Sequence, residues 1–451
     1  MALLPLLVAA AVLGAWSISP VEGPRTPLEI ASLDVDVVGS RTAVVRWVTT
    51  RPARSLVAHG TSAELGLWES GSRQPSLQHQ AVLDGLAFDE RHWLEVVASA
   101  EDESAAALTS FETPPLTRPR LEVQGSTLLL DGKPFLPIMQ HQQCPETVGP
   151  SLAIGFTVFS GPCSHGDPDA VAAAIAGRAV VLLPPEAGGD GHSLPDEPDN
   201  NGITPEELRE QLRKGSGRPA FLTLTANFLN GDEAVYRRYA DVGDVLGFDL
   251  YPINHCRRDL LHEVYDAQVR FEELARGKPT FQWIETGLIR PEYCGGVPPT
   301  PEEVRAQVFL ALAGGVRGIG YFTHTWSPEY DRLDLHAGVA AEMRRTNRQL
   351  EALAPAILSP QAPTATASVP GVYAFARERE GALYVFVVNA TRGRIQTSVE
   401  VAGLAARTLR VFEEGETVPS RGDRFVGALA PLEARIYIAP PPGARVLDDP
   451  R

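Results

Sequence analysis

The chain has 451 residues, which is too long for one hydrophobic core and predicts two or three domains. Acidic residues outnumber basic ones by 56 to 40, which gives a formal net charge of -16. This balance argues against a nucleic-acid partner, because binding to phosphates needs a basic surface. An apolar content of 44% fits a globular protein rather than a disordered one. The sequence shows no sign of an obligate protein partner.

Residues 1–23 form a distinct N-terminal segment. The run from Met1 to Trp16 is apolar and uncharged, and a break rich in proline and glycine follows it. The run resembles the apolar part of a secretory signal, although the basic residues that usually precede it are missing. A helix that tethers the chain to a membrane is the alternative. No other segment is apolar enough to span a bilayer. Because of the signal-like run we expect a secreted or otherwise extracytoplasmic protein. The low lysine content, with abundant alanine, glycine and proline, hints at a GC-rich genome, and we expect a bacterial source.

Residues 27–115 are expected to form a β-sandwich, because apolar and polar residues alternate there in short runs. The runs Val44-Val45-Arg46-Trp47-Val48-Thr49-Thr50 and Phe111-Glu112-Thr113-Pro114-Pro115 make this segment similar to the fibronectin type III-like module that precedes purple acid phosphatases. The resemblance covers this module alone, and the dimetal motifs of the phosphatases are not visible downstream. It implies a spacer or a module that presents substrate.

Residues 118–355 alternate between buried strands and helices after a leading hairpin. The eight candidate strands are Phe135–Met139, Phe156–Phe159, Ala179–Leu183, His192–Glu197, Ala220–Thr225, Val245–Tyr251, Thr280–Glu285 and Gly318–Thr323. Capping boxes that start at Thr204 and Thr300, each followed by proline, begin two of the intervening helices. Eight repeats of strand and helix predict a (β/α)8 TIM barrel.

Residues 360–440 return to a β pattern, with a strong strand at Tyr384–Asn389. We expect a C-terminal β-sandwich that supports the barrel. The predicted fold is therefore multidomain, with a central TIM barrel between two β-sandwiches.

Ionisable side chains end several of the barrel strands. Glu186 follows the third strand, Glu197 ends the fourth, Asp249 lies on the sixth and Glu285 ends the seventh. Catalytic groups of TIM barrels lie at the C-terminal ends of the strands, so these side chains are expected to share one rim. Two carboxyl groups on one rim are the equipment for cleaving a glycosidic bond, because one donates a proton to the leaving oxygen while the other is ionised.

Glu197 lies in Asp196-Glu197-Pro198-Asp199 and Glu285 in Trp283-Ile284-Glu285-Thr286, and through them the barrel resembles the clan of retaining (β/α)8-barrel glycoside hydrolases. The resemblance implies that Glu197 is the acid/base and Glu285 the nucleophile of a double displacement. Asp196 departs from the clan, which usually has an asparagine there to hold the sugar's 2-hydroxyl. This departure leaves the subfamily and the substrate open. A charge on Asp196 or Asp199 would raise the pKa of the acid.

Other rim side chains are expected to bind substrate, among them Asp196, Asp249, Tyr251, His141, His324 and Trp326. In related barrels a tyrosine near the place of Tyr251 hydrogen-bonds the nucleophile, and a position in the wall is the alternative. Asp249 could instead pair with an arginine. Trp326 is expected to form a platform for a sugar ring, with core packing as the alternative. The spacing of the histidines fits no ligand motif, so neither a metal nor a cofactor is expected.

The four cysteines contain no CxxC pair, which disfavours a zinc ribbon. Cys144 and Cys163 follow the first and second strands, and Cys256 and Cys294 follow the sixth and seventh. Each pair therefore lies in loops of neighbouring strands. We predict disulfides Cys144–Cys163 and Cys256–Cys294, which fit an oxidising compartment.

The sequence thus predicts an exported glycosidase that hydrolyses a β-glycosidic bond of an oligo- or polysaccharide. A non-catalytic carbohydrate-binding protein on a degenerate barrel is the main alternative. An esterase or phosphatase on the same scaffold is disfavoured, because the sequence has neither a serine elbow nor a metal cluster.

Overall fold

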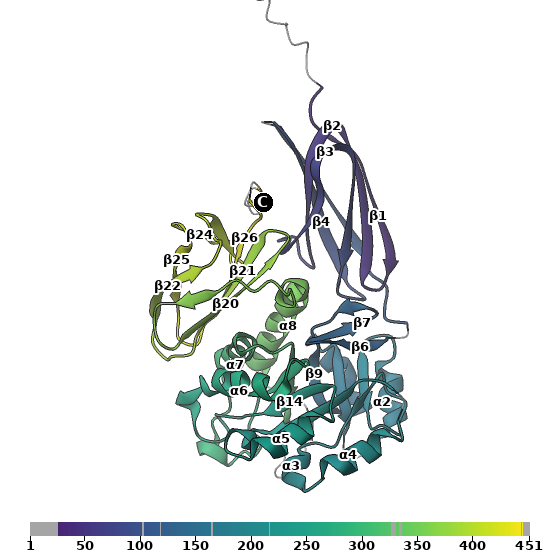
Figure 1. Cartoon of the computed structure of the whole chain (residues 1–451), viewed down its shortest axis with the longest axis vertical. Coiled ribbons are helices and arrows are strands. Elements are labelled where there is room, and N and C mark those ends of the chain that lie inside the picture. Colours follow the sequence, from purple (N-terminus) through teal and green to yellow (C-terminus); the bar gives the residue numbers. More distant parts are fainter. Residues whose placement is uncertain are drawn as a thin grey trace, which may run out of the picture.

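The computed structural model describes residues 26–101, 103–117, 119–163, 166–215, 217–325, 331–332, 336–442 and 444. The predicted signal segment, residues 1–23, and the predicted sugar platform Trp326 lie outside the described residues. Three parts follow one another along the chain: an antiparallel β domain, a barrel and a second antiparallel β domain (Figure 1). This order confirms the predicted fold class.

The N-terminal domain is one antiparallel sheet of five strands. Its strands are β1 (Ile30–Gly39), β2 (Thr42–Gly60), β3 (Leu67–Asp84), β4 (Arg91–Ala100) and β5 (Glu103–Glu112). The long β2 pairs with β1 near its start and with β4 near its end. Its pairing with β3 runs along most of its length and is irregular between Val48 and Leu56, which separates the two halves of β2. Trp47, which is 1% exposed, lies in the hydrophobic core of this domain.

A short hairpin sheet of β6 (Leu121–Gln124), β7 (Thr127–Leu130) and β8 (Lys133–Pro134) leads into the closed barrel. The eight parallel strands of the barrel are β9 (Ile138–Gln143), β10 (Val158–Pro162), β11 (Val180–Leu183), β12 (Gly191–Ser193), β13 (Ala220–Thr225), β14 (Val245–Asp249), β15 (Thr280–Glu285) and β16 (Gly318–Phe322). Each overlaps one of the eight predicted strands. The largest differences are in β9, which ends at Gln143 rather than at Met139, and in β12, which ends at Ser193 rather than at Glu197.

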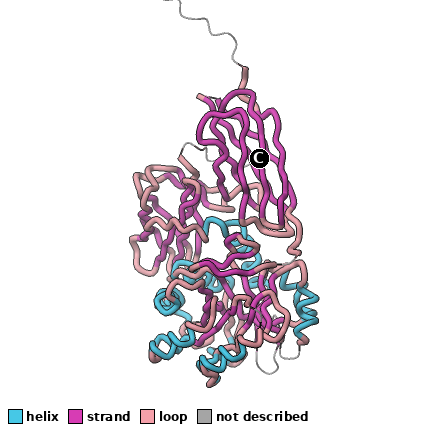
Figure 2. Tube along the Cα trace, turned by 45° about the vertical axis from the view of Figure 1, so that its right-hand side comes forward, coloured by secondary structure: helices cyan, strands magenta, loops and turns pink. Residues whose placement is uncertain are grey.

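Helices cover the outside of the barrel, whereas the two flanking domains consist of strands and loops (Figure 2). The helices are α1 (Val148–Leu152), α2 (Pro168–Ile175), α3 (Pro198–Asn201), α4 (Pro205–Leu212), α5 (Glu233–Ala240), α6 (Glu263–Ala275), α7 (Pro301–Gly314) and α8 (Ala337–Ile357), with 3-10 turns η1 (Pro145–Thr147), η2 (Ala226–Leu229), η3 (Arg258–Leu260) and η4 (Tyr293–Gly296). Both predicted capping boxes are present, at Thr204 before α4 and Thr300 before α7. None of the described helices is long and apolar enough to cross a membrane.

Large side chains fill the barrel interior because glycines on neighbouring strands make room for them. A Cβ atom on Gly247 would lie 2.2 Å from the ring of Phe281, and one on Gly320 would lie 2.3 Å from the ring of Trp283. Phe281 and Trp283 both come from β15 and point to the same face, because alternate residues of a strand share a face. The barrel is therefore packed with side chains up to the level of Trp283.

The C-terminal domain has two sheets. One contains β19 (Ala365–Ala367), β22 (Ile395–Val401) and β25 (Arg424–Leu429), and the other contains β20 (Val372–Arg379), β21 (Ala382–Asn389), β23 (Thr408–Val411), β24 (Thr417–Pro419) and β26 (Ala434–Ala439). A two-strand ladder of β17 (His324–Thr325) and β18 (Asp331–Arg332) follows the barrel. Phe386 of β21 packs on Phe309 of α7, with ring centroids 6.3 Å apart, so the domain is docked against the barrel's helices.

Arg41 joins the N-terminal domain to the barrel. Its side chain is 5% exposed, and its guanidinium donates to backbone carbonyl oxygens on both sides of the junction. The acceptors are Leu86 at 3.0 Å, Gly85 at 3.3 Å, Pro134 at 3.1 Å, Leu130 at 3.3 Å and Lys133 at 3.5 Å. One arginine thus satisfies carbonyl groups that the junction removes from water.

Candidate active site

A cavity with two lobes opens at the C-terminal ends of the barrel strands. The larger lobe has a volume of about 510 Å³ and the smaller one about 310 Å³. His141, Asp196 and Thr223 line both lobes, so the lobes meet at these side chains. The predicted residues Glu197, Asp249 and Tyr251 line the larger lobe. Glu186, which was also predicted at the rim, lines the smaller lobe, so six of the predicted rim residues reach the cavity.

Glu197 reaches the cavity from an unusual backbone conformation. Because β12 ends at Ser193, Glu197 lies beyond the strand and caps the start of α3, with φ 44° and ψ 54°. This left-handed conformation is costly for a residue with a Cβ atom, and such residues gather at functional sites. The Asn200 side chain donates to Glu197 Oε2 at 3.2 Å, and the backbone N–H groups of Asn200 and Asn201 donate to the Glu197 carbonyl. The turn around Glu197 is thus fixed from several sides.

Asp199 ties this turn to the next strand. Its carboxylate accepts hydrogen bonds from the Thr225 backbone N–H at 3.1 Å, from the Thr225 hydroxyl and from the Tyr236 hydroxyl at 3.2 Å. Asp199 therefore holds α3 against β13 and η2, and its negative charge contributes to raising the pKa of Asp196.

Three carboxyl groups meet on the cavity wall. The side chains of Asp249 and Glu197 are hydrogen-bonded to each other. Burial, this hydrogen bond and the charges of Glu197 and Asp196 raise the pKa of Asp249 well above its usual value. Burial, followed by the charges of Glu197 and Asp199, raises the pKa of Asp196 to about 7. The cluster therefore holds at least one proton at neutral pH.

His141 and Tyr251 border the carboxyl cluster. The His141 Nε2 atom lies 3.8 Å from Asp196 Oδ2, and burial lowers the pKa of His141 to about 4, so the imidazole is neutral at neutral pH. Burial, and then the charges of Asp249, Asp196, Glu197 and Glu285, raises the pKa of Tyr251 well above its usual value. The Tyr251 hydroxyl therefore keeps its proton and is available as a donor.

Aromatic rings form the floor of the larger lobe. Trp283 donates from Nε1 to the Thr223 hydroxyl at 2.9 Å, and its ring lies edge-on to His141 at a centroid distance of 5.2 Å. Phe322, Tyr251 and Tyr293 are the other aromatic residues that line this lobe. Aromatic faces of this kind bind the C–H groups of sugars and other apolar ligand surfaces.

Glu285 lies behind the cavity wall rather than on it. Its side chain is 0% exposed. Glu285 is not one of the described residues that line either lobe of the cavity. Ile253 N donates to Oε1 at 2.9 Å, and Asn254 donates to Oε2 from its backbone N at 2.9 Å and from Nδ2 at 2.8 Å. These hydrogen bonds lower the pKa of Glu285, but burial raises it by more, and the pKa is about 7. The role of Glu285 as nucleophile stays a prediction, and this geometry does not favour it.

The remaining predicted residues divide into two groups. His324 is 2% exposed and packs edge-on against His141 and Phe322, so it supports the wall from behind. Both predicted disulfides, Cys144–Cys163 and Cys256–Cys294, are formed, and no described cysteine is free. No group of three or more histidine, cysteine or acidic residues among the described residues could hold a metal ion.

Several cavity residues were missed by sequence reasoning. They are Ser160, Ser193, Gln211, Thr223, Thr225, Asn200, Asn201, Asn227, Arg290 and Tyr293. Thr223 and Thr225 were recognisable, because they alternate on β13 with the same face inward. Arg290 and Tyr293 lie in a long loop after β15 whose path no periodic pattern reveals.

No family model matches the chain, and no curated protein does either. Among solved structures, an alpha-amylase from Geobacillus thermoleovorans, complexed with acarbose, is 9% identical over 68% of this chain and 98% of that chain, with a TM-score of 0.46. A GH30 endoxylanase from Clostridium papyrosolvens C71 is 12% identical over 71% and 99% of the two chains, with a TM-score of 0.41. A beta-glucuronidase from Parabacteroides merdae is 9% identical over 91% of this chain and 73% of that chain, with a TM-score of 0.35.

These structures are glycoside hydrolases, and their similarity to this chain is distant. At identities of 9–12% and TM-scores below 0.5, the similarity carries no argument about chemistry.

Proposed function

We propose that this chain is a glycoside hydrolase whose proton donor is the carboxyl pair Glu197–Asp249. The observation that carries the proposal is the hydrogen bond between these two side chains on the wall of an aromatic-lined cavity. Cleavage of a glycosidic bond needs a carboxyl group that keeps its proton at neutral pH, and burial beside a second carboxyl group produces one. Tyr251, Trp283 and Phe322 supply the surface on which a sugar ring would lie.

In this mechanism the pair gives its proton to the glycosidic oxygen, the bond from that oxygen to the anomeric carbon breaks, and the aglycone leaves as an alcohol. Water then supplies a hydroxyl group to the anomeric carbon, and its proton passes to a carboxylate. Asp196 is the further carboxyl group on the wall, and with a pKa of about 7 it is about half ionised at neutral pH. We therefore assign to Asp196 the role of stabilising positive charge on the sugar or accepting the water's proton.

The finer predictions from the sequence remain proposals. They include a β-linkage and substrate contacts from His141, Tyr251 and Asp249. Retention of configuration would need Asp196 to act as the nucleophile, because Glu285 is fully buried. The burial of Glu285 supports assigning the cavity chemistry to Asp196, Glu197 and Asp249 instead of to Glu285. The two disulfides support the proposed extracytoplasmic location, because such bonds persist in oxidising compartments.

The test compares wild type with Glu197→Gln on a panel of aryl glycosides and oligosaccharides. We expect the variant to lose roughly 10²- to 10⁴-fold in kcat, the range of a general acid, with unchanged substrate affinity by calorimetry. Glu210→Gln, on the exposed face of α4, is the matched control and should keep full activity. Full activity of Glu197→Gln would refute the proposal. Binding of oligosaccharides without turnover by the wild type would instead identify a carbohydrate-binding protein.

A further inference from the structure

The Glu285 carboxylate is the centre of a buried hydrogen-bond cluster between two loops. It accepts three hydrogen bonds, all from Ile253 and Asn254 in the loop that follows β14. A carboxylate offers about four acceptor sites, so this one segment uses most of them. Since the side chain is 0% exposed, no face of the carboxylate is open to a ligand in the cavity.

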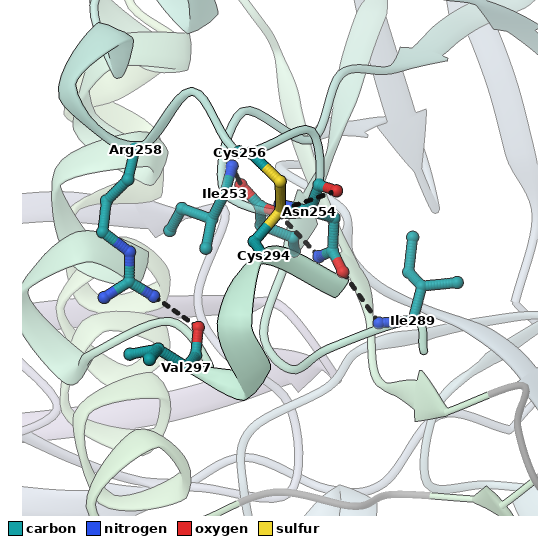
Figure 3. The surroundings of a disulfide bond; sticks show 8 residues. Ile253, Asn254, Cys256, Arg258, Ile289, Cys294 and Val297 are labelled. Carbon is teal, nitrogen blue, oxygen red and sulfur yellow. Dashed lines mark hydrogen bonds between the residues drawn. A yellow bond between two sulfur atoms is a disulfide. The ribbon is translucent and has the colours of Figure 1, made fainter. Parts of the chain in front are cut away.

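Asn254 extends the cluster to the loop that follows β15. Its Nδ2 atom also donates to the Gly287 carbonyl at 3.0 Å, and its Oδ1 atom accepts from Ile289 N at 2.9 Å. Asn254 is 4% exposed, and these bonds use both ends of its amide (Figure 3). The two loops are therefore bonded to each other through one asparagine side chain, which Glu285 orients.

Two further links join the same loops. The Cys256–Cys294 disulfide lies beside Asn254, and Arg258 donates to the Val297 carbonyl at 2.6 Å (Figure 3). Arg258 also donates to the Pro298 carbonyl at 2.7 Å. The loop after β14 is thus attached to the loop after β15 near its start, its middle and its end.

These two loops carry one wall of the larger lobe. Tyr251 and His255 come from the first loop, and Ile289, Arg290 and Tyr293 come from the second. The Arg290 guanidinium lies 5.6 Å from the centre of the Tyr293 ring, so the two side chains present a joint surface. None of these side chains lies on a barrel strand, and their positions depend on how the loops are held.

We propose that Glu285 is a positioning residue: through Ile253 and Asn254 it sets the cavity wall formed by Tyr251, His255, Arg290 and Tyr293. A nucleophile must come to about 3–3.5 Å from the anomeric carbon, which requires an exposed oxygen. The Glu285 oxygens face backbone and amide N–H groups instead. The inference rests on the proposed function only for what the wall binds; the loop anchoring stands without it.

The test measures hydrogen exchange and steady-state kinetics on full-length Glu285→Gln, with Glu197→Gln as the matched comparison. In this variant the NH2 group of the glutamine side chain would face N–H donors that the carboxylate accepts in the wild type, so hydrogen bonds between the loops are lost. We therefore expect the backbone amides of residues 251–256 and 287–294 to exchange at least tenfold faster than in the wild type. Exchange in Glu197→Gln should match wild type. In turnover, KM should rise more than kcat falls, and added azide should give no glycosyl azide.

The opposite pattern would overturn the proposal. One such result is unchanged hydrogen exchange in Glu285→Gln together with a large loss of kcat at constant KM. The other is that azide restores the glycosidase activity of Glu285→Ala. If wild type turns over no glycoside, the proposed function fails while the exchange data still decide the role of Glu285. If Glu285→Gln does not fold, Asn254→Ala provides the same exchange test, and unchanged exchange at residues 287–294 in that variant refutes the anchoring.

Discussion

The carboxyl group of Asp249, at the end of β14, is hydrogen-bonded to that of Glu197, which lies beyond the end of β12. The two residues come from the sixth and fourth strands of the barrel, and their pairing needs one shared proton. This relationship places the proton store of the site across the end of β13, the strand that lies between β12 and β14 in the barrel. It also makes the protonation of each group depend on the other.

Replacing Asp249 by Asn is expected to remove the shared proton while leaving an N–H donor for Glu197. For glycosides with poor leaving groups we expect a kcat loss of roughly 10²-fold or more, the effect of losing a general acid. Dinitrophenyl glycosides, whose leaving group needs no proton, should lose far less. The measurement is kcat for both substrate types, and equal losses on both would show that Asp249 does not supply the proton.

Glu285 should make the protein less stable as pH rises. Burial, assisted by the charge of Glu303, raises its pKa from 4.5 to about 7, so the ionised form is disfavoured in the folded protein. Its stabilising contribution is therefore complete below pH 4.5 and is lost as pH rises through 7. The linkage amounts to roughly 3 kcal/mol. Calorimetric Tm values at pH 4.5 and 8 should show a smaller decrease for Glu285→Gln than for wild type, whereas equal decreases would contradict the assignment.

Gly320→Ala should disturb the cavity floor, because the added Cβ atom would lie 2.3 Å from the Trp283 ring. Trp283 must move, and its bond to Thr223 is lost. We expect a stability loss of about 1–3 kcal/mol, typical of an overpacked core, together with a change in tryptophan fluorescence and weaker ligand binding. Gly149→Ala on α1, where nothing lies within 4 Å of the new atom, is the control and should change none of these.

The two disulfides offer a matched comparison. Cys256–Cys294 spans 38 residues and Cys144–Cys163 spans 19, so loop entropy predicts that the first stabilises the fold by roughly 0.6 kcal/mol more. Double serine variants of each pair, compared by urea denaturation, test this order. The variant of the first pair should also raise KM, because that disulfide anchors the wall with Arg290 and Tyr293. If the double serine variant of Cys144–Cys163 raised KM more than that of Cys256–Cys294, the Cys256–Cys294 disulfide would not be the anchor of the wall.

Arg41→Ala should separate the N-terminal domain from the barrel. The substitution leaves several buried carbonyl oxygens without a donor, and we expect a loss of roughly 3 kcal/mol or more. Arg41→Lys keeps the charge but not the planar guanidinium, so its stability should lie between that of the wild type and that of Arg41→Ala. Faster proteolysis between residues 113 and 120 would report the loosened junction. Unchanged cleavage would show that other contacts hold the domains.

The eight barrel strands could be predicted because each is a short apolar run between turn residues. The fourth strand was predicted too long, since Leu194 continues the apolar run, but Pro195 cannot donate a ladder hydrogen bond and the strand ends before it. The disulfides followed from the strand positions. In each of these cases the decisive information is local in the sequence or set by strand order.

The surroundings of Glu285 could not be predicted in the same way. Its place at the end of β15 was correct, yet the strand pattern does not reveal whether the carboxylate meets ligand or loop. That depends on the path of residues 250–256, which fold back over the strand end and cover it. Arg290 and Tyr293 reach the cavity by a similarly irregular path. Long-range loop packing therefore decides the part of the site that the sequence left open.

The left-handed backbone of Glu197 has a consequence for how this protein could evolve. A residue with a Cβ atom that also precedes a proline is an expensive choice at φ 44°, and glycine or asparagine would relieve part of that cost. Selection for heat resistance alone should therefore enrich replacements at this position, and each gain in Tm should be accompanied by loss of the acidic group. For as long as the cavity is under selection, the stabilising replacements at this position would therefore stay unused, and thermal adaptation would have to come from other positions.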